Sequence, residues 1–230
     1  MKQTQAFLST YTADVSGVCS ALFELGGMTV MHDASGCNST YNTHDEPRWY
    51  DMDSLVYISG LSELEAVLGD DEKLISDITD AARQLHPRFI ALAGTPIPMI
   101  TGCDLPAIAR EVECRTEIPS FAVPSNGIGS YVSGAGQALR LYAERFITEK
   151  AEKKKNAVNI LGATPLDFSV NGCVQEMARR LQDAGFIVQS VFAMGSDISA
   201  IEKASAAEAN LVVSSVGLPA AQYLQETFGT

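Results

Sequence analysis

The stretch "DDEKLISDITDAARQLHPRFIALAG", residues 70–94, joins a helical pattern to a strand pattern and decides the fold. Over 70–86, apolar side chains recur at helical spacing, and acidic residues at the start suit the positive end of a helix dipole. The following "RFIALAG" (88–94) is an apolar run of strand length. A helix that leads into a wholly apolar strand is typical of a parallel sheet buried between helices.

The same alternation continues on both sides of this stretch. Apolar runs of strand length lie at 28–32, 54–59 and 119–124, and helical patterns lie at 104–115 and 134–150. Alternating strands and helices predict an α/β fold with a doubly wound parallel sheet.

After the lysine-rich run Lys153–Lys155 the pattern starts again. It predicts further strands and helices at 157–162, 171–185, 186–192, 197–208, 209–215 and 218–229. We therefore predict two Rossmann-like lobes with parallel sheets, one over 1–150 and one over 156–230, with a boundary between Thr148 and Ala157. A parallel sheet this small is hard to cover on both faces, so we expect the second lobe to be incomplete through truncation of the chain.

The composition bounds the class of protein. The chain has 230 residues, of which 46% are hydrophobic and 19% charged, as in soluble globular proteins. It contains no apolar run of membrane-spanning length and no apolar core of a secretory signal, so we expect a cytoplasmic protein without membrane contact. A net charge of −12 argues against a nucleic-acid partner, because phosphate binding needs clustered Lys and Arg.

The cysteines point to no disulfide framework. There are five, at positions 19, 37, 103, 114 and 173, and none forms a C-x-x-C pair. Cys114 and Cys173 lie in helical patterns and are interpreted as small, half-buried apolar residues. Cys37 differs, since it follows Gly36 in a small polar loop after the strand at 28–32. From its setting alone it is a packed filler, a nucleophile or a metal ligand.

Several stretches, in order along the chain, resemble the nitrogenase component 1 family, which includes subunits that build its cofactor or reduce protochlorophyllide. "MTVMHDASGC" (28–37) resembles that family's strand, histidine and Gly-Cys loop, and "NTHDEP" (42–47) resembles an Asn-x-His…Glu-Pro stretch of its β-type subunits. "PRFIALAGTPIPMITGCDLPAI" (87–108) is similar to its next strand, cluster loop and helix start. Residues 123–139 resemble its Gly/Ser-rich loop, and 158–192 resemble the start of its second Rossmann-like domain.

The resemblance implies an oxidoreductase subunit with an iron–sulfur cluster. It assigns cofactor binding to Gly36 and Cys37, with Cys37 as a metal ligand. It also implies an oligomer with a paralogous subunit that shares the cluster, and an ATP-dependent iron–sulfur reductase as electron donor. This chain has no Walker A sequence, so another protein must perform any ATP-driven step.

The chain departs from the family at other cysteines. The family usually supplies three per subunit, and here only Cys37 is matched; Thr95 stands at the third position. Cys19 and Cys103 are candidate substitute metal ligands, provided the fold brings them to the same edge. The alternative is a non-redox binding or scaffold module, a degenerate relative that holds a tetrapyrrole, a metal chelate or a partner subunit.

Two further features are open to a functional interpretation. "GIGSYVSG" (127–134) places glycines before a helix, the geometry for phosphate at a helix N-terminus, although it is not a G-x-G-x-x-G after the first strand. His32 ends a strand and His44 lies in a loop. Both are more typical of hydrogen-bonded histidines than of metal ligands.

Overall fold

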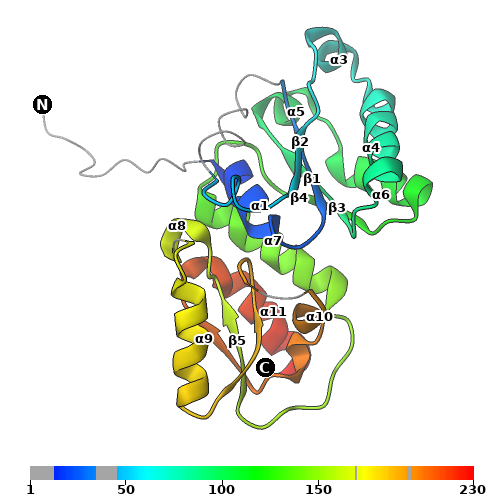
Figure 1. The fold of residues 1–230 in the computed structure, drawn as a ribbon. Coiled ribbons are helices and arrows are strands. Elements are labelled where there is room, and N and C mark those ends of the chain that lie inside the picture. Colours follow the sequence, from blue (N-terminus) through cyan, green and yellow to red (C-terminus); the bar gives the residue numbers. More distant parts are fainter. Residues whose placement is uncertain (1–12, 35–45, 169, 196–197) are drawn as a thin grey trace, which may run out of the picture.

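The computed structural model describes residues 13–34, 46–168, 170–195 and 198–230, which form two parallel sheets (Figure 1). The strands are β1 (Met28–His32), β2 (Leu55–Ile58), β3 (Ile90–Gly94), β4 (Ser120–Val123), β5 (Ala157–Leu161), β6 (Ile187–Val191) and β7 (Ala209–Val212). The first sheet has the order β2-β1-β3-β4 and the second β6-β5-β7, with every pair parallel. The predicted α/β fold with two parallel sheets is confirmed.

Helices cover both faces of the first sheet. α1 (Asp14–Leu22) and α7 (Tyr131–Phe146) pack on one face, and α4 (Asp71–Leu85) and α6 (Leu105–Thr116) on the other. Successive residues of a strand pack against the helices on opposite faces of the sheet, because side chains alternate across a strand. In β1, Val30 packs with α4 and α6, whereas Met31 packs with α1 and α7.

The decisive stretch forms its helix and strand for the reasons that the sequence suggested. The Asp70 carboxylate accepts a hydrogen bond from Lys73 N and caps α4, whose buried side chains include Leu74 and Ile78. The helix ends at His86, which has a positive φ of 48°. The chain then enters β3, buried along its whole length.

The second sheet also lies between helices. α9 (Cys173–Asp183) covers one face, and α10 (Ile198–Glu202) and α11 (Leu218–Phe228) lie on the other. Polar side chains cross this second face: the fully buried Asn159 on β5 donates to Asn210 on β7 and accepts from Ser190 on β6. These bonds link all three strands and favour one register over its alternatives.

Short elements complete the described chain. They are α3 (Glu63–Leu68), α5 (Pro96–Thr101), α8 (Pro165–Phe168) and the 3₁₀ turns Ala204–Ala206 and Ser215–Gly217. Periodicity could not predict these elements, because none completes two helical turns. No helix in the described ranges is long and apolar enough to cross a membrane.

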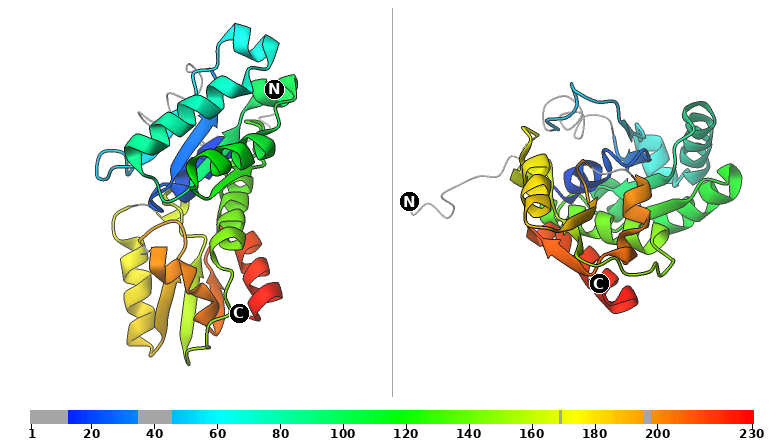
Figure 2. Two further views of the ribbon diagram at one scale, coloured as in Figure 1. Left: turned by 90° about the vertical axis from the view of Figure 1, so that its right-hand side faces the viewer. Right: turned by 60° about the horizontal axis from the view of Figure 1, so that its bottom comes forward.

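α7 belongs to both lobes, by which we mean each sheet with its helices. It packs against α1 in the first lobe and against α11 in the second, so one apolar core continues between the lobes (Figure 2). The helix begins earlier than the predicted 134–150, because the Ser130 hydroxyl caps it by accepting from Ser133 N. The linker at 148–157 thus separates the sheets but not the core, and the proposed domain boundary remains a prediction.

The contact between α1 and α7 depends on glycine. A Cβ on Gly17 would lie 2.1 Å from the Tyr131 carbonyl oxygen, and one on Gly134 would lie 1.9 Å from that of Asp14. Both positions must therefore lack a side chain for the two backbones to approach this closely. Part of the glycine-rich stretch before and within α7 thus serves helix packing.

Candidate functional site at the carboxyl edge of the first sheet

The carboxyl ends of the parallel strands meet at one edge of the first sheet, which is where open α/β sheets bind ligands. β1 ends there at His32 and leads into the segment 35–45. The predicted site residues Gly36 and Cys37, and also His44, lie outside the described residues. The described residues show how both ends of that segment are held.

Hydrogen bonds from neighbouring strands hold the end of β1. Ser59, just after β2, lies with its Oγ 2.9 Å from His32 Nδ1 and accepts from Asp33 N at 3.1 Å. Thr95, just after β3, donates from Oγ1 to the His32 carbonyl at 2.8 Å. The backbone that enters the segment 35–45 is thereby tied to both adjacent strands.

His32 is nearly enclosed at this edge. Burial lowers its pKa, and the carboxylates of Asp71, Asp33 and Glu65 oppose that effect only in part. The imidazole is therefore neutral near pH 7 and engaged with Ser59. This agrees with its interpretation as a hydrogen-bonded histidine.

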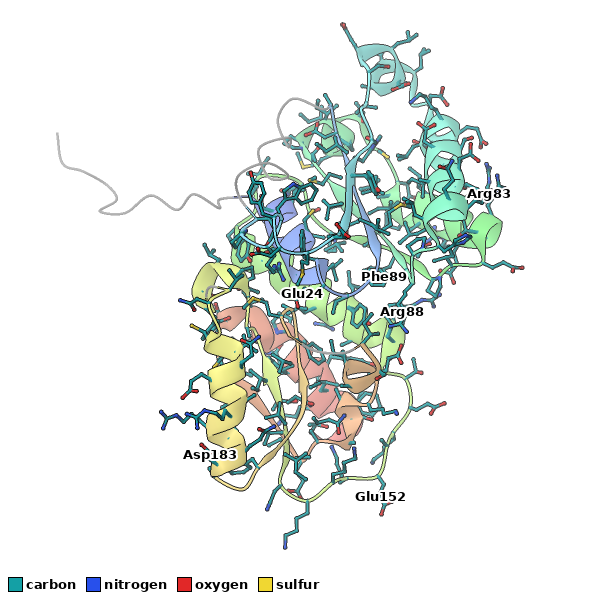
Figure 3. All side chains as sticks on the ribbon, viewed as in Figure 1. Glu24, Arg83, Arg88, Phe89, Glu152 and Asp183 are labelled. Carbon is teal, nitrogen blue, oxygen red and sulfur yellow. The ribbon has the colours of Figure 1, made fainter. Side chains whose placement is uncertain are left out.

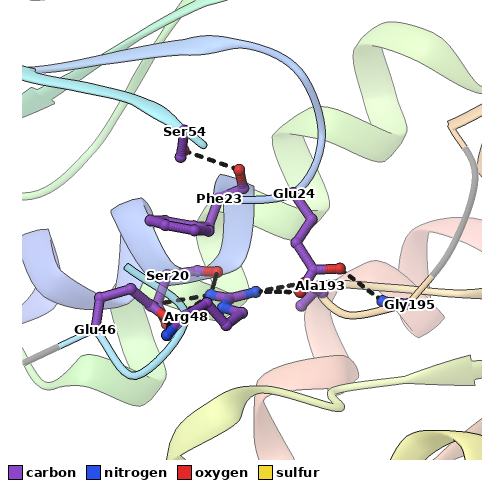
Figure 4. A network of polar contacts seen from close by, with 8 residues as sticks. All are labelled: Ser20, Phe23, Glu24, Glu46, Arg48, Ser54, Ala193 and Gly195. Carbon is purple, nitrogen blue, oxygen red and sulfur yellow. Dashed lines mark hydrogen bonds and ion pairs between the residues drawn. The ribbon is translucent and has the colours of Figure 1, made fainter. Parts of the chain in front are cut away.

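Arg48 holds the chain where it leaves the same segment (Figure 4). Its Nε donates to Glu46 Oε1 at 2.6 Å and its Nη2 to Glu46 Oε2 at 3.0 Å and to the Ser20 carbonyl at 2.7 Å. Nη1 donates to Glu24 Oε1 at 2.9 Å and to the Ala193 carbonyl at 3.1 Å. All five N–H donors of the guanidinium are thus satisfied in a side chain that is only 2% exposed.

The charge of Arg48 is stable despite its burial. Desolvation works against the cation, but the hydrogen bonds and negative charge of Glu46 and then Glu24 outweigh it and raise the pKa of Arg48. The guanidinium carbon also lies 4.6 Å from the centre of the Phe23 ring, within cation–π range. Arg48 is therefore a permanently charged anchor for the residues that follow the segment 35–45.

The glycine-rich loop before α7 already holds an anion of its own chain. The Asp14 carboxylate accepts from Gly127 N at 2.8 Å, from Asn126 N at 3.0 Å and from Val15 N at 2.8 Å. A Cβ on Gly129 would lie 2.7 Å from Asp14 Oδ2. Asp14 thus occupies the N–H groups of Asn126 and Gly127, and the Asn126 side chain accepts from the next two N–H groups, those of Ile128 and Gly129.

The other two candidate metal ligands, Cys19 and Cys103, pack on opposite faces of the first sheet. Cys19 is fully buried on α1, in the core on the α1 and α7 face, and burial strongly raises the pKa of its thiol. Cys103 precedes α6, packs with the core on the opposite face, and its thiol pKa is raised to about 11, first by burial and then by Asp71. The sheet therefore separates Cys19 from Cys103. Cys114 and Cys173 are exposed, so their expected partial burial was wrong.

The described residues alone do not fit an iron–sulfur cluster. Such clusters are bound by several thiolates, and burial keeps the Cys19 and Cys103 thiols protonated. Within the described ranges, no three His, Cys, Asp or Glu side chains gather in a way that could hold a metal ion. A cluster at this edge would need Cys37 together with groups that lie outside the described part of the chain.

The comparison with protein families identifies the chain. The model of the nitrogenase component 1 type oxidoreductases matches residues 15–230. This protein belongs to that family. The expected family membership is therefore confirmed.

Individual family members match only in part. One of the light-independent protochlorophyllide reductase subunits of Nostoc punctiforme is 29% identical over 173 residues, which are 70% of this chain and 34% of that protein. The nitrogenase molybdenum–iron protein beta chain of Bradyrhizobium diazoefficiens is 28% identical over 180 residues, 73% of this chain and 34% of the relative. The solved structure of nitrogenase Cp1 at pH 5 shares the fold, with a TM-score of 0.77 at 20% identity, over 100% of this chain and 48% of that one. The chain thus spans about a third of the length of these curated relatives.

A pocket of about 330 Å³ lies beside the carboxyl edge of this nitrogenase-like fold. Its walls are mostly apolar and come from the ends of β3 and β4 and from the turn that carries Cys103; they are formed by Gly94, Pro98, Met99, Cys103, Leu105, Pro106, Ala122, Val123, Pro124 and Ser125. Small-molecule sites are concave and mostly apolar in this way. The pocket is a second feature of the edge with the character of a binding site.

The sequence alone did not point to Asp14 or Arg48, although each makes several hydrogen bonds in this region. Asp14 is the first residue of α1, and an acidic residue there was a usable signal for a helix start. Arg48 directly follows the "NTHDEP" stretch, and its neighbour Glu46 was quoted only as part of a motif. Its role depends on Ala193, which no local pattern connects with it.

Proposed function

We propose that this chain is a subunit of a nitrogenase-like oxidoreductase, with Gly36 and Cys37 at the site of an iron–sulfur cluster. The bound cluster would supply one-electron transfer to the substrate, with electrons arriving from an ATP-dependent iron–sulfur reductase. A paralogous subunit, or a second copy, would supply the missing ligands. Dinitrogen, a tetrapyrrole, an organosulfur compound and a precursor cluster are all compatible substrate classes, and we expect a cytoplasmic complex.

One observation carries the proposal beyond family membership. Both ends of the segment that contains Gly36 and Cys37 are anchored, by Ser59 and Thr95 on one side and by Arg48 on the other. A loop with fixed ends restricts where its side chains can reach, as a ligand position requires. This chain's own contribution is to fix the residues on both sides of that segment and to keep His32 neutral at the end of β1.

The test is metal analysis of the protein recovered with its native partners. A tagged chain is expressed in its own cells, purified without oxygen, and assayed for iron, acid-labile sulfide and visible absorbance. We expect the broad brown absorbance of an iron–sulfur protein, lost in Cys37→Ala. Cys114→Ala is the matched control, since this exposed cysteine lies on α6 away from the edge, and it should leave the colour unchanged.

Two results would overturn the electron-transfer proposal. One is a complex that contains its partner subunit but no iron. The other is an iron–sulfur spectrum that survives Cys37→Ala unchanged, because Cys37 would then be no ligand.

The pocket beside Cys103 favours a second candidate, a non-redox module that binds a tetrapyrrole or metal chelate. The metal-free chain would then bind a tetrapyrrole in solution, measured by its absorbance shift. Ala122→Trp, which fills the pocket, should abolish that binding. If the parent chain and Ala122→Trp bind equally, the pocket is not the site.

A further inference from the structure

Two of the contacts between the lobes differ in chemistry. The first is apolar: α7 lies against α11 and the turn before it, with Gly136 close to Pro219. The second lies beside α1, where polar groups of the first lobe bond to the loop after β6; Phe192 and Ala193 of that loop are also buried in the shared apolar core (Figure 4). Figure 3 shows Glu24, which belongs to this second attachment, at the junction of the lobes.

We call the second attachment the Arg48 clamp: Glu24, Glu46 and Arg48 of the first lobe, with the Ala193 carbonyl and the Gly195 N–H of the second. Arg48 Nη1 donates to the Ala193 carbonyl at 3.1 Å, and Glu24 Oε2 accepts from Gly195 N at 2.8 Å. Arg48 and Glu24 are also paired with each other at 2.9 Å. The two charged side chains thus bind the same short loop, Arg48 as a hydrogen-bond donor and Glu24 as an acceptor.

The loop at Ala193–Gly195, to which Arg48 and Glu24 bond, has a strained backbone. Ala193 is fully buried and has a φ of +84°, a left-handed value that a residue with a side chain rarely adopts. Such strain persists only where the surroundings hold it. Among the described residues of the first lobe, Arg48 and Glu24 bond to this turn, and Ala193 also packs in the shared apolar core.

The clamp contacts the second lobe just after a strand of its sheet. β6 ends at Val191, so Ala193 and Gly195 lie at the carboxyl edge of the second sheet. That edge is the usual ligand crevice of an open parallel sheet. Here Arg48 and Glu24 of the first lobe bond to the loop that follows β6 at this edge.

We infer that the Arg48 clamp is a latch that keeps the second lobe closed on the first, with the α7–α11 contact as the hinge. Releasing the clamp lets the strained loop relax and exposes the carboxyl edge of β6. The inference is independent of the proposed function, because it concerns lobe position and not metal content.

Two native cysteines allow a direct test of lobe position. Cys114 on α6 and Cys173 on α9 are exposed and lie in different lobes, so each accepts a spin label. Cys37→Ser and Cys103→Ser remove two further thiols, and the buried Cys19 stays. Pulsed electron paramagnetic resonance on the full chain then gives the distribution of the distance between the labels.

The variants separate the clamp from general effects of losing an arginine. Arg48→Met and Arg48→Lys remove the fork that reaches Ala193. Glu24→Ala removes the bond to Gly195 and the pairing of Glu24 with Arg48, while Arg48 keeps its bonds to Glu46 and to the Ala193 carbonyl. The control is Arg115→Met: Arg115 makes ion pairs with Glu72 and Glu111, all within the first lobe.

We expect one narrow distance population in the parent and in Arg115→Met, and a broader distribution with a longer component in both Arg48 variants. Hydrogen exchange of the Gly195 amide should rise about tenfold in Glu24→Ala, the change expected for loss of one hydrogen bond. If Arg48→Met does not fold, Glu24→Ala carries the test. Unchanged distances in the Arg48 variants that fold, or unchanged Gly195 exchange in Glu24→Ala, would overturn the latch.

Discussion

Replacing Asp14 by alanine should destabilise the first lobe more than its place at a helix start suggests. The residue is 4% exposed, and its carboxylate accepts three backbone N–H bonds, from Val15, Asn126 and Gly127. Two of these come from the loop that begins α7, so Asp14 joins the starts of α1 and α7. Alanine would leave those donors without a protein acceptor.

The size of the effect follows from the kind of bonds lost. A hydrogen bond to a charged group contributes about 1.5–3 kcal/mol, and an ordinary N-cap about 1 kcal/mol. Because Asn126 and Gly127 are half-buried, water can replace part of what they lose. We therefore expect Asp14→Ala to lower the free energy of unfolding by about 3 kcal/mol.

Urea denaturation at pH 7 measures this loss, with Asp104→Ala as the matched control. Asp104 also caps a helix, but its bond to Ala107 N is exposed, so its loss should cost about 1 kcal/mol. Phosphate should partly restore Asp14→Ala and leave the parent unchanged, because the variant exposes N–H groups suited to an anion. Equal losses in the two variants would refute the reasoning, since Asp14 would then be only a local cap.

Three other predictions follow from single contacts. Gly17→Ala should cost at least about 2 kcal/mol of unfolding free energy, because its Cβ would lie 2.1 Å from a backbone oxygen. A Cβ on Gly136 would lie 3.1 Å from Pro219 and 3.3 Å from the Val216 carbonyl oxygen, so Gly136→Ala should cost less; urea midpoints compare the two variants. Asn159→Leu should lower the free energy of unfolding by about 2 kcal/mol by leaving Ser190 without its acceptor, and hydrogen exchange should rise in the second sheet alone; protection lost equally in both sheets would contradict a local role. The pKa of His32 is lower in the folded chain than its ordinary value of 6.5, so the unfolded chain binds a proton first as the pH falls below 6.5. The stability that neutral His32 contributes to folding is therefore complete above pH 6.5 and is lost as the pH falls toward the folded pKa. Urea denaturation at pH 7.5 and 5.5 should show that the free energy of unfolding falls less between these pH values in His32→Asn than in the parent. Equal decreases would contradict a lowered pKa of His32 in the folded chain.

The strands were predictable because each is an apolar run with no competing pattern. The predicted strand at 28–32 coincides with β1, and the run at 88–94 contains β3. Both are buried on two faces, and such strands need no alternation to be recognised. Helix boundaries were less certain, because caps such as Ser130 act over a single bond that periodicity does not register.

The candidate site was predictable only where chemistry is local in the chain. Gly36 and Cys37 stand out through their own neighbours, and the family resemblance drew attention to them. The clamp around Arg48 could not be predicted, since it joins residues 145 positions apart. The glycine-rich loop was misleading for a similar reason: its partner, Asp14, lies 113 positions away from Gly127.

The packing also bears on which cysteine could accompany Cys37 at a cluster. Cys19 lies in the core beneath α1, and a metal ion could reach its thiol only if α1 moved away from the sheet. Cys103 is only half-buried, lines the pocket at the carboxyl edge, and has its thiol near Asp71. A metal ion that lowers the pKa of a thiol can overcome the modest burial of Cys103 at far smaller cost than the complete burial of Cys19. If this chain supplies a second thiolate without rearrangement of its fold, we therefore expect it to come from Cys103, and iron content should fall in Cys103→Ser.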